Sequence, residues 1–389
     1  MRSRRLVALV VAVVGVAALA WTLTPYVRAA SLIVRAADLG GQVEAFANER
    51  ARAVTVRPPH MVPTRQSDVP AQFYEPAGSV QRTVLLVPGI HSMGIDEPRL
   101  RRLASDLAGS GVRAMTLALP DLQRYRVTAQ SSDVIEDAVA WMARQPSLAP
   151  DGRIGIVGIS FAGGLALVAA GRPSIRDKVA FVVSFGGHGD LPRVLTYLST
   201  GEAPRVEGVT THPPHDYGVA VILYGLADTM VPPEQVEPLR EGVRTFLLAS
   251  QLTLVSQEQA DATFARARAM AKALPQPAAT YLTYVNERDV KRLGPALVPY
   301  LDRLGAESPA GSPERATSLP AAPVYLLHGD DDTVIPAAES AILGEFLREH
   351  GVDAHVLLSG LITHAEVDRS AAASETWKLV KFWASVLRQ

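Results

Sequence analysis

The sequence predicts an α/β fold, in which a mostly parallel sheet is covered by helices on both faces and carries an inserted, mainly helical cap. Apolar runs rich in β-branched residues alternate with helical patterns over residues 72–184, as expected for βαβ units. The alternation stops near residue 190, where helical periodicity begins, and it resumes at residue 324. These observations predict one α/β core, built from residues 53–190 and 321–389, with a helical insertion and linker at residues 191–320.

The first part of the core follows this alternation closely. Strand character begins near Val54, and further strands are predicted at residues 72–74, 83–87, 112–119, 153–157 and 179–184, with helices at residues 98–107 and 132–144. Ligands of such sheets bind beyond the carboxyl ends of the strands. We therefore expect the functional side chains at that edge.

The insertion and the second part of the core are predicted in the same way. Helical spacing marks residues 236–250, 257–274 and 290–304, a Pro- and Gly-rich loop spans 307–313, strands follow at 324–327 and 354–358, and a loop at 359–364 precedes the terminal helix. A helical segment inserted above the carboxyl ends of the strands is expected to form a lid, or cap, over the site.

The N-terminal residues 1–28 differ in composition from the rest. Three arginines precede an apolar stretch that runs from residue 6 to residue 27, and about 20 residues suffice to cross a bilayer. The positive charges favour an N-terminus inside and a globular body outside. We expect a membrane-anchored protein with its globular domain extracytoplasmic. The alternative is secretion after signal-peptide cleavage at the Ala-Leu-Ala site of residues 18–20.

Residues 29–52 are predicted to form a juxtamembrane amphipathic helix. This helix is expected either to pack beneath the main domain or to lie at the membrane surface. Its apolar residues recur at helical spacing: Leu32, Ile33, Ala36, Leu39, Val43 and Phe46.

Composition narrows the range of partners and cofactors. The net charge of −1 argues against a polyanion-binding surface, so no nucleic acid partner is expected. The chain has no cysteine, which excludes disulfides and thiolate metal sites. Its histidines lack the spacing of a metal-binding pair, so we expect no metal, and the chemistry predicted below needs no cofactor.

The junction at residues 154–164 predicts a nucleophile. Ser160 stands between small residues, in Gly158-Ile159-Ser160-Phe161-Ala162, where an apolar strand passes into a buried helix. This is the pattern of a nucleophile elbow, in which a strained turn exposes the serine hydroxyl. The N–H of Phe161, at the start of the helix, is then placed to bind an oxyanion.

A serine needs a base and an acid that orients the base, and the end of the chain offers both. Asp332 follows a buried strand, and His364 precedes the last helix. Asp330 and Asp331 compete for the acid role. His355 competes with His364, although it lies within a strand rather than beyond its end.

A near-copy of the acidic loop occurs earlier in the chain. Asp228 stands in Tyr224-Gly225-Leu226-Ala227-Asp228, a stretch that echoes residues 328–332. It is an alternative acid if residues 219–223 form a strand. The other interpretation is that residues 217–231 form a cap helix ending at Pro232.

Four motifs together resemble the α/β-hydrolase superfamily, over about residues 70–190 and 320–389. They are Val87-Pro88-Gly89-Ile90 after an early strand, Gly158-x-Ser160-x-Ala162, His328-Gly329-x-x-Asp332, and a histidine before the last helix. The resemblance implies that Asp332 is the triad acid and that Ile90 donates a second oxyanion N–H. His91 and Ser92, beside the expected oxyanion hole, and His188, just beyond the strand at 179–184, are candidate pocket residues. Residues in such positions are more often packing or loop residues.

The predicted function is that of a serine hydrolase acting on a carboxylic ester through an acyl-enzyme, with a small or lipid-like, hydrophobic acyl substrate. A thioesterase, amidase or peptidase would use the same residues. A non-catalytic binding protein on the same fold is the remaining alternative.

Overall fold

The computed structural model describes residues 22–37, 40–80, 82–253, 255–304, 308–363, 366–367 and 373–389. Residues 6–21 of the predicted membrane span, the signal-peptide site at residues 18–20, Leu39 and His364 lie outside these ranges. Among the residues that are described, no helix is both long enough and apolar enough to cross a membrane.

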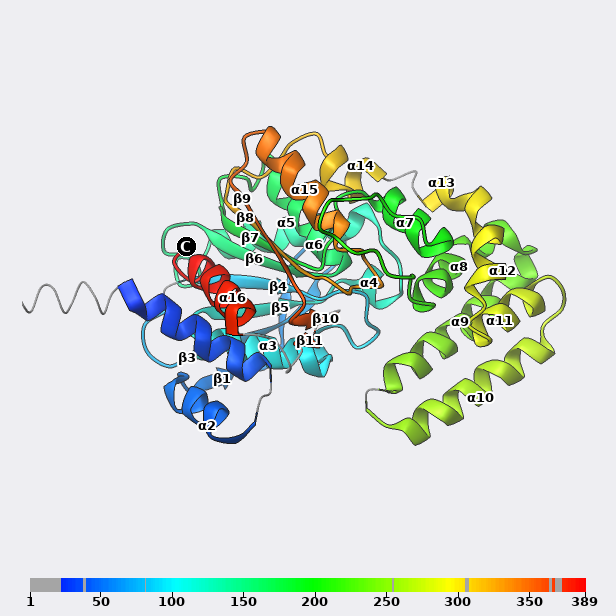
Figure 1. Cartoon of the computed structure of the whole chain (residues 1–389), viewed down its shortest axis with the longest axis horizontal. Coiled ribbons are helices and arrows are strands. Elements are labelled where there is room, and N and C mark those ends of the chain that lie inside the picture. Colours follow the sequence, from blue (N-terminus) through cyan, green and yellow to red (C-terminus); the bar gives the residue numbers. More distant parts are fainter. Residues whose placement is uncertain are drawn as a thin grey trace, which may run out of the picture.

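A nine-stranded sheet forms the centre of the described structure (Figure 1). Its strand order is β1-β3-β5-β4-β6-β7-β8-β9, with β2 paired to β3. β3 runs antiparallel to β5, and the strands from β5 to β9 are parallel to one another. The strands are β1 Val54–Val56, β2 His60–Val62, β3 Val69–Pro76, β4 Thr83–Val87, β5 Arg113–Leu117, β6 Ile154–Ile159, β7 Val179–Phe185, β8 Val324–Gly329 and β9 Ala354–Ser359. The predicted mostly parallel sheet is confirmed.

Helices cover both faces of the sheet because each central strand is apolar on both sides. Strand β4 illustrates this: Leu85 and Val87 join the core beneath one set of helices, and Val84 and Leu86 join the core beneath the other. The first set is α5 Ala129–Ala143, α6 Phe161–Gly171 and α15 Ala338–Glu349. The second set is α3 Pro98–Gly109, α16 Ala373–Val386 and the helix over residues 22–36.

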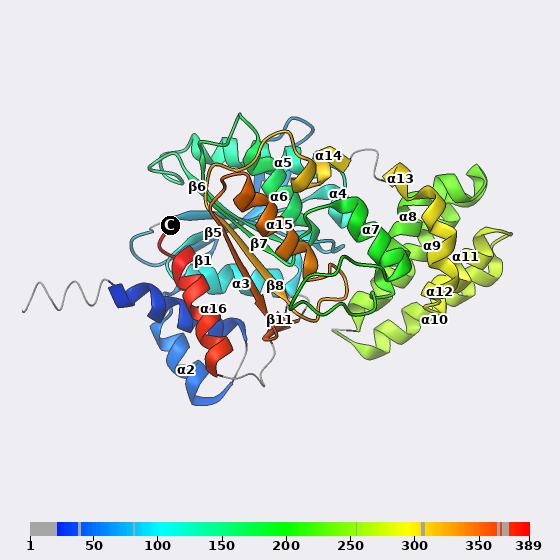
Figure 2. The same ribbon diagram turned by 45° about the horizontal axis from the view of Figure 1, so that its top comes forward.

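The insertion between β7 and β8 is mainly helical, as predicted, and lies at one end of the sheet (Figure 2). Its elements are α7 Leu191–Thr200, α8 Tyr217–Met230, α9 Pro233–Leu252, α10 Gln257–Ala273, α11 Ala278–Asn286, α12 Val290–Leu297, η2 Val298–Tyr300, α13 Leu301–Leu304, α14 Ser308–Gly311 and η4 Pro313–Arg315. Two shorter helices, α4 Pro120–Gln123 and η1 Gly94–Asp96, belong to the α/β part of the chain and not to the insertion.

Three predicted elements of the second half were wrong in detail. The helix expected over residues 290–304 is divided into α12, η2 and α13, because Pro299 supplies no N–H to continue it. The expected loop 307–313 contains the short helix α14. The expected loop 359–364 contains β10 Ile362–Thr363, which pairs antiparallel with β11 Glu366–Val367.

The single helix predicted over residues 29–52 was also wrong. The chain forms a helix over residues 22–36 and a separate helix α2, Gly41–Arg50. Gly40 and Gly41 both have positive φ, 70° and 66°, a conformation that interrupts a right-handed helix. Leu32 and Ile33 are buried as expected, whereas Val43 and Phe46 of α2 are 59% and 56% exposed.

Candidate functional site

Ser160 occupies a strained turn between β6 and α6. Its backbone angles are φ 55° and ψ −134°, outside the regions that a non-glycine residue ordinarily adopts. Two backbone hydrogen bonds of 2.7 Å hold this conformation, from Ser160 N to Phe185 O and from Gly163 N to Ser160 O. The residue is only 7% exposed. The arrangement is that of a nucleophile elbow.

The glycines around Ser160 are required by close backbone contacts. A Cβ atom on Gly158 would overlap the carbonyl group of Ala162 and lie 2.9 Å from Gly163 Cα. A Cβ atom on Gly163 would lie 3.0 Å from Gly187 Cα and would overlap Ser184 Oγ. Only a residue without a side chain fits at either position, so the elbow depends on both.

The predicted oxyanion residues lie on two sides of Ser160. Phe161 begins α6, and the N–H groups of a first helical turn have no acceptor within the helix. Ile90 follows Gly89, whose position for a Cβ atom is 3.0 Å from Ser160 Cβ and 3.6 Å from Ser160 Oγ. The loop after β4 therefore passes directly beside the serine.

Asp332 lies in the loop between β8 and α15 and is 3% exposed. Its Oδ1 accepts hydrogen bonds from Val334 N (2.8 Å) and Ile335 N (3.0 Å). Its Oδ2 lies 3.3 Å from the position of a Cβ atom on Gly186, directly after β7. Since β6, β7 and β8 are parallel neighbours, Ser160, Gly186 and Asp332 share the carboxyl edge of the sheet.

His328 packs beside Asp332, with its Nε2 atom 3.4 Å from Asp332 Oδ2. Its Nε2 atom lies 2.8 Å from Ile335 O and so donates to that carbonyl, while Nδ1 lies 2.7 Å from Ser340 Oγ and accepts from the hydroxyl. The ring is fully buried. It fixes the loop that carries Asp332.

The competing acids and the competing histidine lie elsewhere. Asp330 and Asp331 lie at the surface. Partial desolvation of the Asp330 carboxyl, together with the charges of Glu375 and Asp331, raises the pKa of Asp330. His355 stacks on Tyr325 at 4.8 Å between ring centroids, with 48% of its side chain exposed. It pairs in register with the second residue of β8, away from the end that carries Asp332.

His364 lies outside the described residues, but the chain leading to it is described. β9 ends at Ser359, and β10 at Ile362–Thr363 contacts β8. The chain that leads to position 364 therefore lies against β8.

Asp228 lies on the cap helix α8, so the cap-helix interpretation of this stretch is confirmed and the strand interpretation was wrong. Its side chain is 63% exposed and pairs with Arg240 at 3.3 Å. The resemblance to the acidic loop is therefore one of sequence without a matching structure.

The three candidate pocket residues have different environments. His188 is fully buried, donates from Nε2 to Gly311 O at 2.7 Å and packs on the Phe161 ring at 5.6 Å. It supports the elbow helix and does not line a pocket rim. His91 is half-buried, and burial lowers its pKa. Ser92 donates to Gln251 Oε1 of α9 at 2.7 Å.

The contact of Ser92 with Gln251 joins the oxyanion loop to the cap, and sequence reasoning missed it. Tyr125, from the turn after α4, donates to the same oxygen at 3.4 Å. Gln251 is far from both residues along the chain, so no local pattern signals the contact. The apolar core of the cap also includes Phe161 and Ile335, which places the cap against the residues that flank Ser160 and Asp332.

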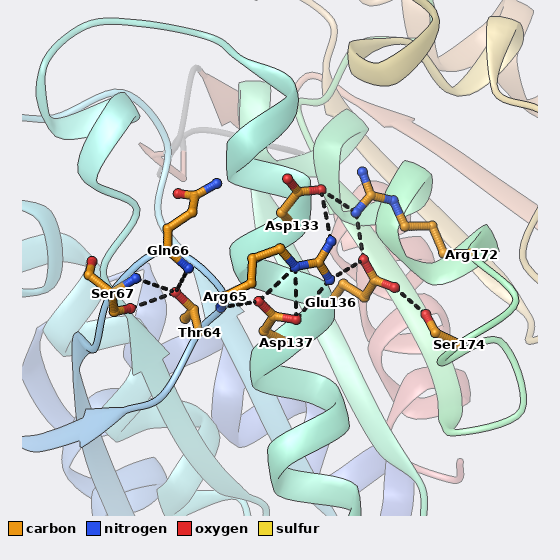
Figure 3. A network of polar contacts seen from close by, with 9 residues as sticks. All are labelled: Thr64, Arg65, Gln66, Ser67, Asp133, Glu136, Asp137, Arg172 and Ser174. Atoms are coloured by element: carbon orange, nitrogen blue, oxygen red, sulfur yellow. Dashed lines mark hydrogen bonds and ion pairs between the residues drawn. The ribbon is translucent and has the colours of Figure 1, made fainter.

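A polar network anchors the far end of α6 to α5 (Figure 3). Arg172 donates to Asp133 (2.5 Å) and Glu136 (2.6 Å). Arg65 reaches Glu136 and Asp137 at 2.7 Å each. Because α6 begins at the elbow, this network holds the helix that supports Ser160.

No family model matches the chain, and no curated protein matches it. Among solved structures, an esterase from Pyrobaculum calidifontis is 15% identical, with 93% of this chain and 90% of that chain covered and a TM-score of 0.48. A carboxyl esterase 2 from Tuber melanosporum is 14% identical, with 86% of each chain covered and a TM-score of 0.46. A putative dienelactone hydrolase from Klebsiella pneumoniae is 14% identical, with 86% and 99% covered and a TM-score of 0.42.

The chain has the α/β-hydrolase fold. The strand order, the antiparallel β3 and the serine at the turn after β6 establish this architecture from the structure itself. The fold hosts many chemistries, so it does not by itself assign one.

Proposed function

We propose that this protein is a serine hydrolase that cleaves a carboxylic ester through an acyl-enzyme intermediate. The observation that carries the proposal is the strained backbone of Ser160, at φ 55°, together with a buried carboxylate at the same edge of the sheet. A strained conformation persists only where the surrounding structure enforces it, and such strain is concentrated at functional sites.

In the proposed reaction, Ser160 Oγ attacks the acyl carbon and its proton passes to His364. The carbonyl oxygen becomes an oxyanion and accepts hydrogen bonds from the N–H groups of Ile90 and Phe161, each worth roughly 3 kcal/mol in the transition state. His364 then gives the proton to the departing alkoxide. Water, activated in the same way, releases the carboxylic acid and regenerates Ser160.

Asp332 is proposed to orient His364 and to stabilise its imidazolium form. Two backbone N–H groups already bind Asp332 Oδ1, and they fix the position of the carboxylate. Its Oδ2 is directed toward the end of β7, the side on which Ser160 lies.

A fluorophosphonate probe distinguishes this enzyme from a non-catalytic binding protein, because only an activated serine reacts with it. We expect the wild type to be labelled and Ser160→Ala to remain unlabelled. If the two proteins react equally slowly, the chain is a binding protein on a hydrolase fold.

The acyl group is proposed to be hydrophobic. Support comes from the cap, whose apolar core is continuous with Phe161 and with Ile335 after Asp332. p-Nitrophenyl esters of graded chain length test this: kcat/KM is expected to rise with acyl length. A higher kcat/KM on matched thioesters or amides would favour the thioesterase, amidase or peptidase alternative.

The globular domain is proposed to lie outside the cytoplasm, attached to the membrane by its N-terminal segment. The support is the sequence of residues 1–27. Protease added to spheroplasts is expected to digest the globular domain, and full protection would contradict the orientation. Release of a mature chain that begins after residue 20 would favour a cleaved signal peptide.

A further inference from the structure

Four polar side chains meet between the oxyanion loop and the cap. Ser92 lies two residues after Ile90, Tyr125 follows α4, and Gln251 and Tyr217 belong to the cap helices α9 and α8. Ser92 and Tyr125 donate to Gln251 Oε1 at 2.7 and 3.4 Å. Burial and the nearby Tyr125 side chain raise the pKa of Tyr217. These four residues, without Ile90, form what we call the polar cluster.

The polar cluster reaches both loops of the proposed reaction centre. On one side, Ser92 belongs to the loop that carries the proposed oxyanion donor. On the other side, the backbone N–H of His215, two residues before Tyr217, donates to the carbonyl of Thr333 at 2.8 Å. Thr333 directly follows Asp332. The polar cluster therefore extends from the oxyanion loop to the loop of the proposed acid.

The hydroxyl donors determine the orientation of the Gln251 amide. The 2.7 Å separation from Ser92 Oγ is the length of an O–H···O hydrogen bond and is shorter than most N–H···O bonds, so Oε1 faces Ser92. The amide nitrogen Nε2, which carries two N–H donors, lies on the other side. Within the part of the chain that the structure describes, Nε2 is buried and has no hydrogen-bond partner. A buried donor without an acceptor costs free energy, which an acceptor from a ligand would recover.

Tyr217 supplies a second group of this kind. Its Oη atom is buried and, among the described residues, has no hydrogen-bond partner. Both groups are neutral donors, and they suit a neutral oxygen that has two lone pairs. An anion would need a cation to pair with, but Arg244, whose charge acts on Tyr125, is already paired with Glu241 at 2.7 Å.

We propose that the polar cluster binds a second oxygen of the substrate, a neutral carbonyl oxygen that accepts hydrogen bonds from Gln251 Nε2 and Tyr217 Oη. The carbonyl that reacts lies at Ser160, and the rest of the substrate packs on the apolar core of the cap. This inference rests on the proposed function and deepens it. The preferred substrate is an ester that carries an additional carbonyl group, and not a plain hydrocarbon ester.

Matched pairs of esters test the inference on the full chain and locate the additional carbonyl. In one series, p-nitrophenyl 5-oxohexanoate, 6-oxoheptanoate and 7-oxooctanoate are each compared with the unsubstituted ester of the same chain length. In the other series, 4-oxopentyl and 5-oxohexyl hexanoate are compared with pentyl and hexyl hexanoate. The rate with Ser160→Ala is subtracted throughout. For at least one pair, kcat/KM of the oxo ester should exceed that of its match about tenfold or more.

Two variants remove the proposed donors. Tyr217→Phe should lower this ratio about tenfold, and its urea midpoint should equal or exceed that of the wild type, because the hydroxyl has no partner to lose. Gln251→Glu keeps an oxygen toward Ser92 but replaces the Nε2 donor by an oxygen, so it should lower the ratio as well. Tyr74→Phe is the matched control, since Tyr74 Oη is also buried and without a partner among the described residues, but lies in the core beneath α3. It should keep the wild-type ratio.

The outcomes separate the inference from the proposed function. A ratio near one for every pair, in a wild type that a fluorophosphonate labels, would overturn the inference and leave the serine hydrolase in place. A wild type that is not labelled would contradict the proposed function and the inference with it. A Tyr217→Phe protein that unfolds at lower urea and keeps the wild-type ratio would also overturn the inference, because the hydroxyl would then bind a fixed water and not the substrate.

Discussion

Gly89 lies against Ser160 so closely that a Cβ atom on Gly89 would come within 3.0 Å of Ser160 Cβ. This contact sets the distance between the serine and the loop that carries Ile90. Gly89→Ala should move that loop and misplace one oxyanion donor, lowering kcat by about 10²-fold. Steady-state kinetics on a p-nitrophenyl ester measure the effect. Gly311→Ala is the matched control, because its nearest neighbour would be Leu191 Cδ2 at 3.4 Å; an equal loss there would contradict the interpretation.

Gly158 and Ala162 should differ in how well they tolerate substitution. Gly158→Ala places a methyl group on the backbone of Ala162, 2.8 Å from its carbonyl carbon, and should lower the free energy of unfolding by about 2 kcal/mol or more. Ala162→Gly should cost only about 1 kcal/mol of helix stability and retain activity. Chemical denaturation gives both values. A stable, active Gly158→Ala protein would mean that the elbow tolerates a different backbone path.

Asp332 and Asp228 are a matched pair of acids in similar sequence contexts. Asp332→Asn should reduce kcat by up to about 10⁴-fold, because the amide cannot hold the imidazole in the reactive tautomer. Asp228→Asn should leave kcat unchanged, since this side chain faces solvent and pairs with Arg240. Equal losses in the two variants would remove Asp332 from the proposed role.

Glu136 should make stability depend on pH on the acid side. Burial opposes ionisation of Glu136, but hydrogen bonds from Ser174, Arg172 and Arg65 outweigh it and hold its pKa below the ordinary 4.5. A lowered pKa means that the folded state binds this proton less readily than the unfolded state. The stabilisation is therefore complete above pH 4.5 and is lost as the pH falls through the folded-state pKa.

Glu136→Gln should cost about 2 kcal/mol of unfolding free energy at pH 7, the scale of hydrogen bonds to a charged group. This difference from wild type should shrink as the pH is lowered from about 5 to about 3. Urea denaturation across this pH range measures it. Glu349→Gln, at an exposed position of α15, serves as the control, and a Glu136→Gln penalty independent of pH would contradict the account.

The sequence predicted the local features of the site because their causes are local. A strand, a serine between small residues and a helix follow one another over residues 154–171, so the turn at Ser160 can be recognised without tertiary contacts. Asp332 could be named as a candidate acid for the same reason, since it follows a buried strand. The requirement for glycine at 163 was not predicted, because it arises from Ser184 and Gly187 on the neighbouring strand end.

The secondary structure predicted from the sequence was wrong where tertiary contacts or backbone conformation outweigh the periodicity of apolar residues. The helix predicted across residues 29–52 is interrupted by two glycines of positive φ. The stretch around Asp228, by contrast, packs as α8 in the cap core, which agrees with the cap-helix interpretation and not with the strand. The contact between Ser92 and Gln251 joins residues 159 positions apart, a distance over which no sequence pattern operates.

The most direct test of the central claim is to trap the acyl-enzyme and locate the acyl group. Rapid mixing with a p-nitrophenyl ester should give a burst of about one equivalent of p-nitrophenol, and peptide mass spectrometry should place the acyl group on Ser160. His364→Ala should abolish the burst, whereas His355→Ala should retain it. An acyl group on another residue, or turnover that persists in Ser160→Ala, would contradict the account.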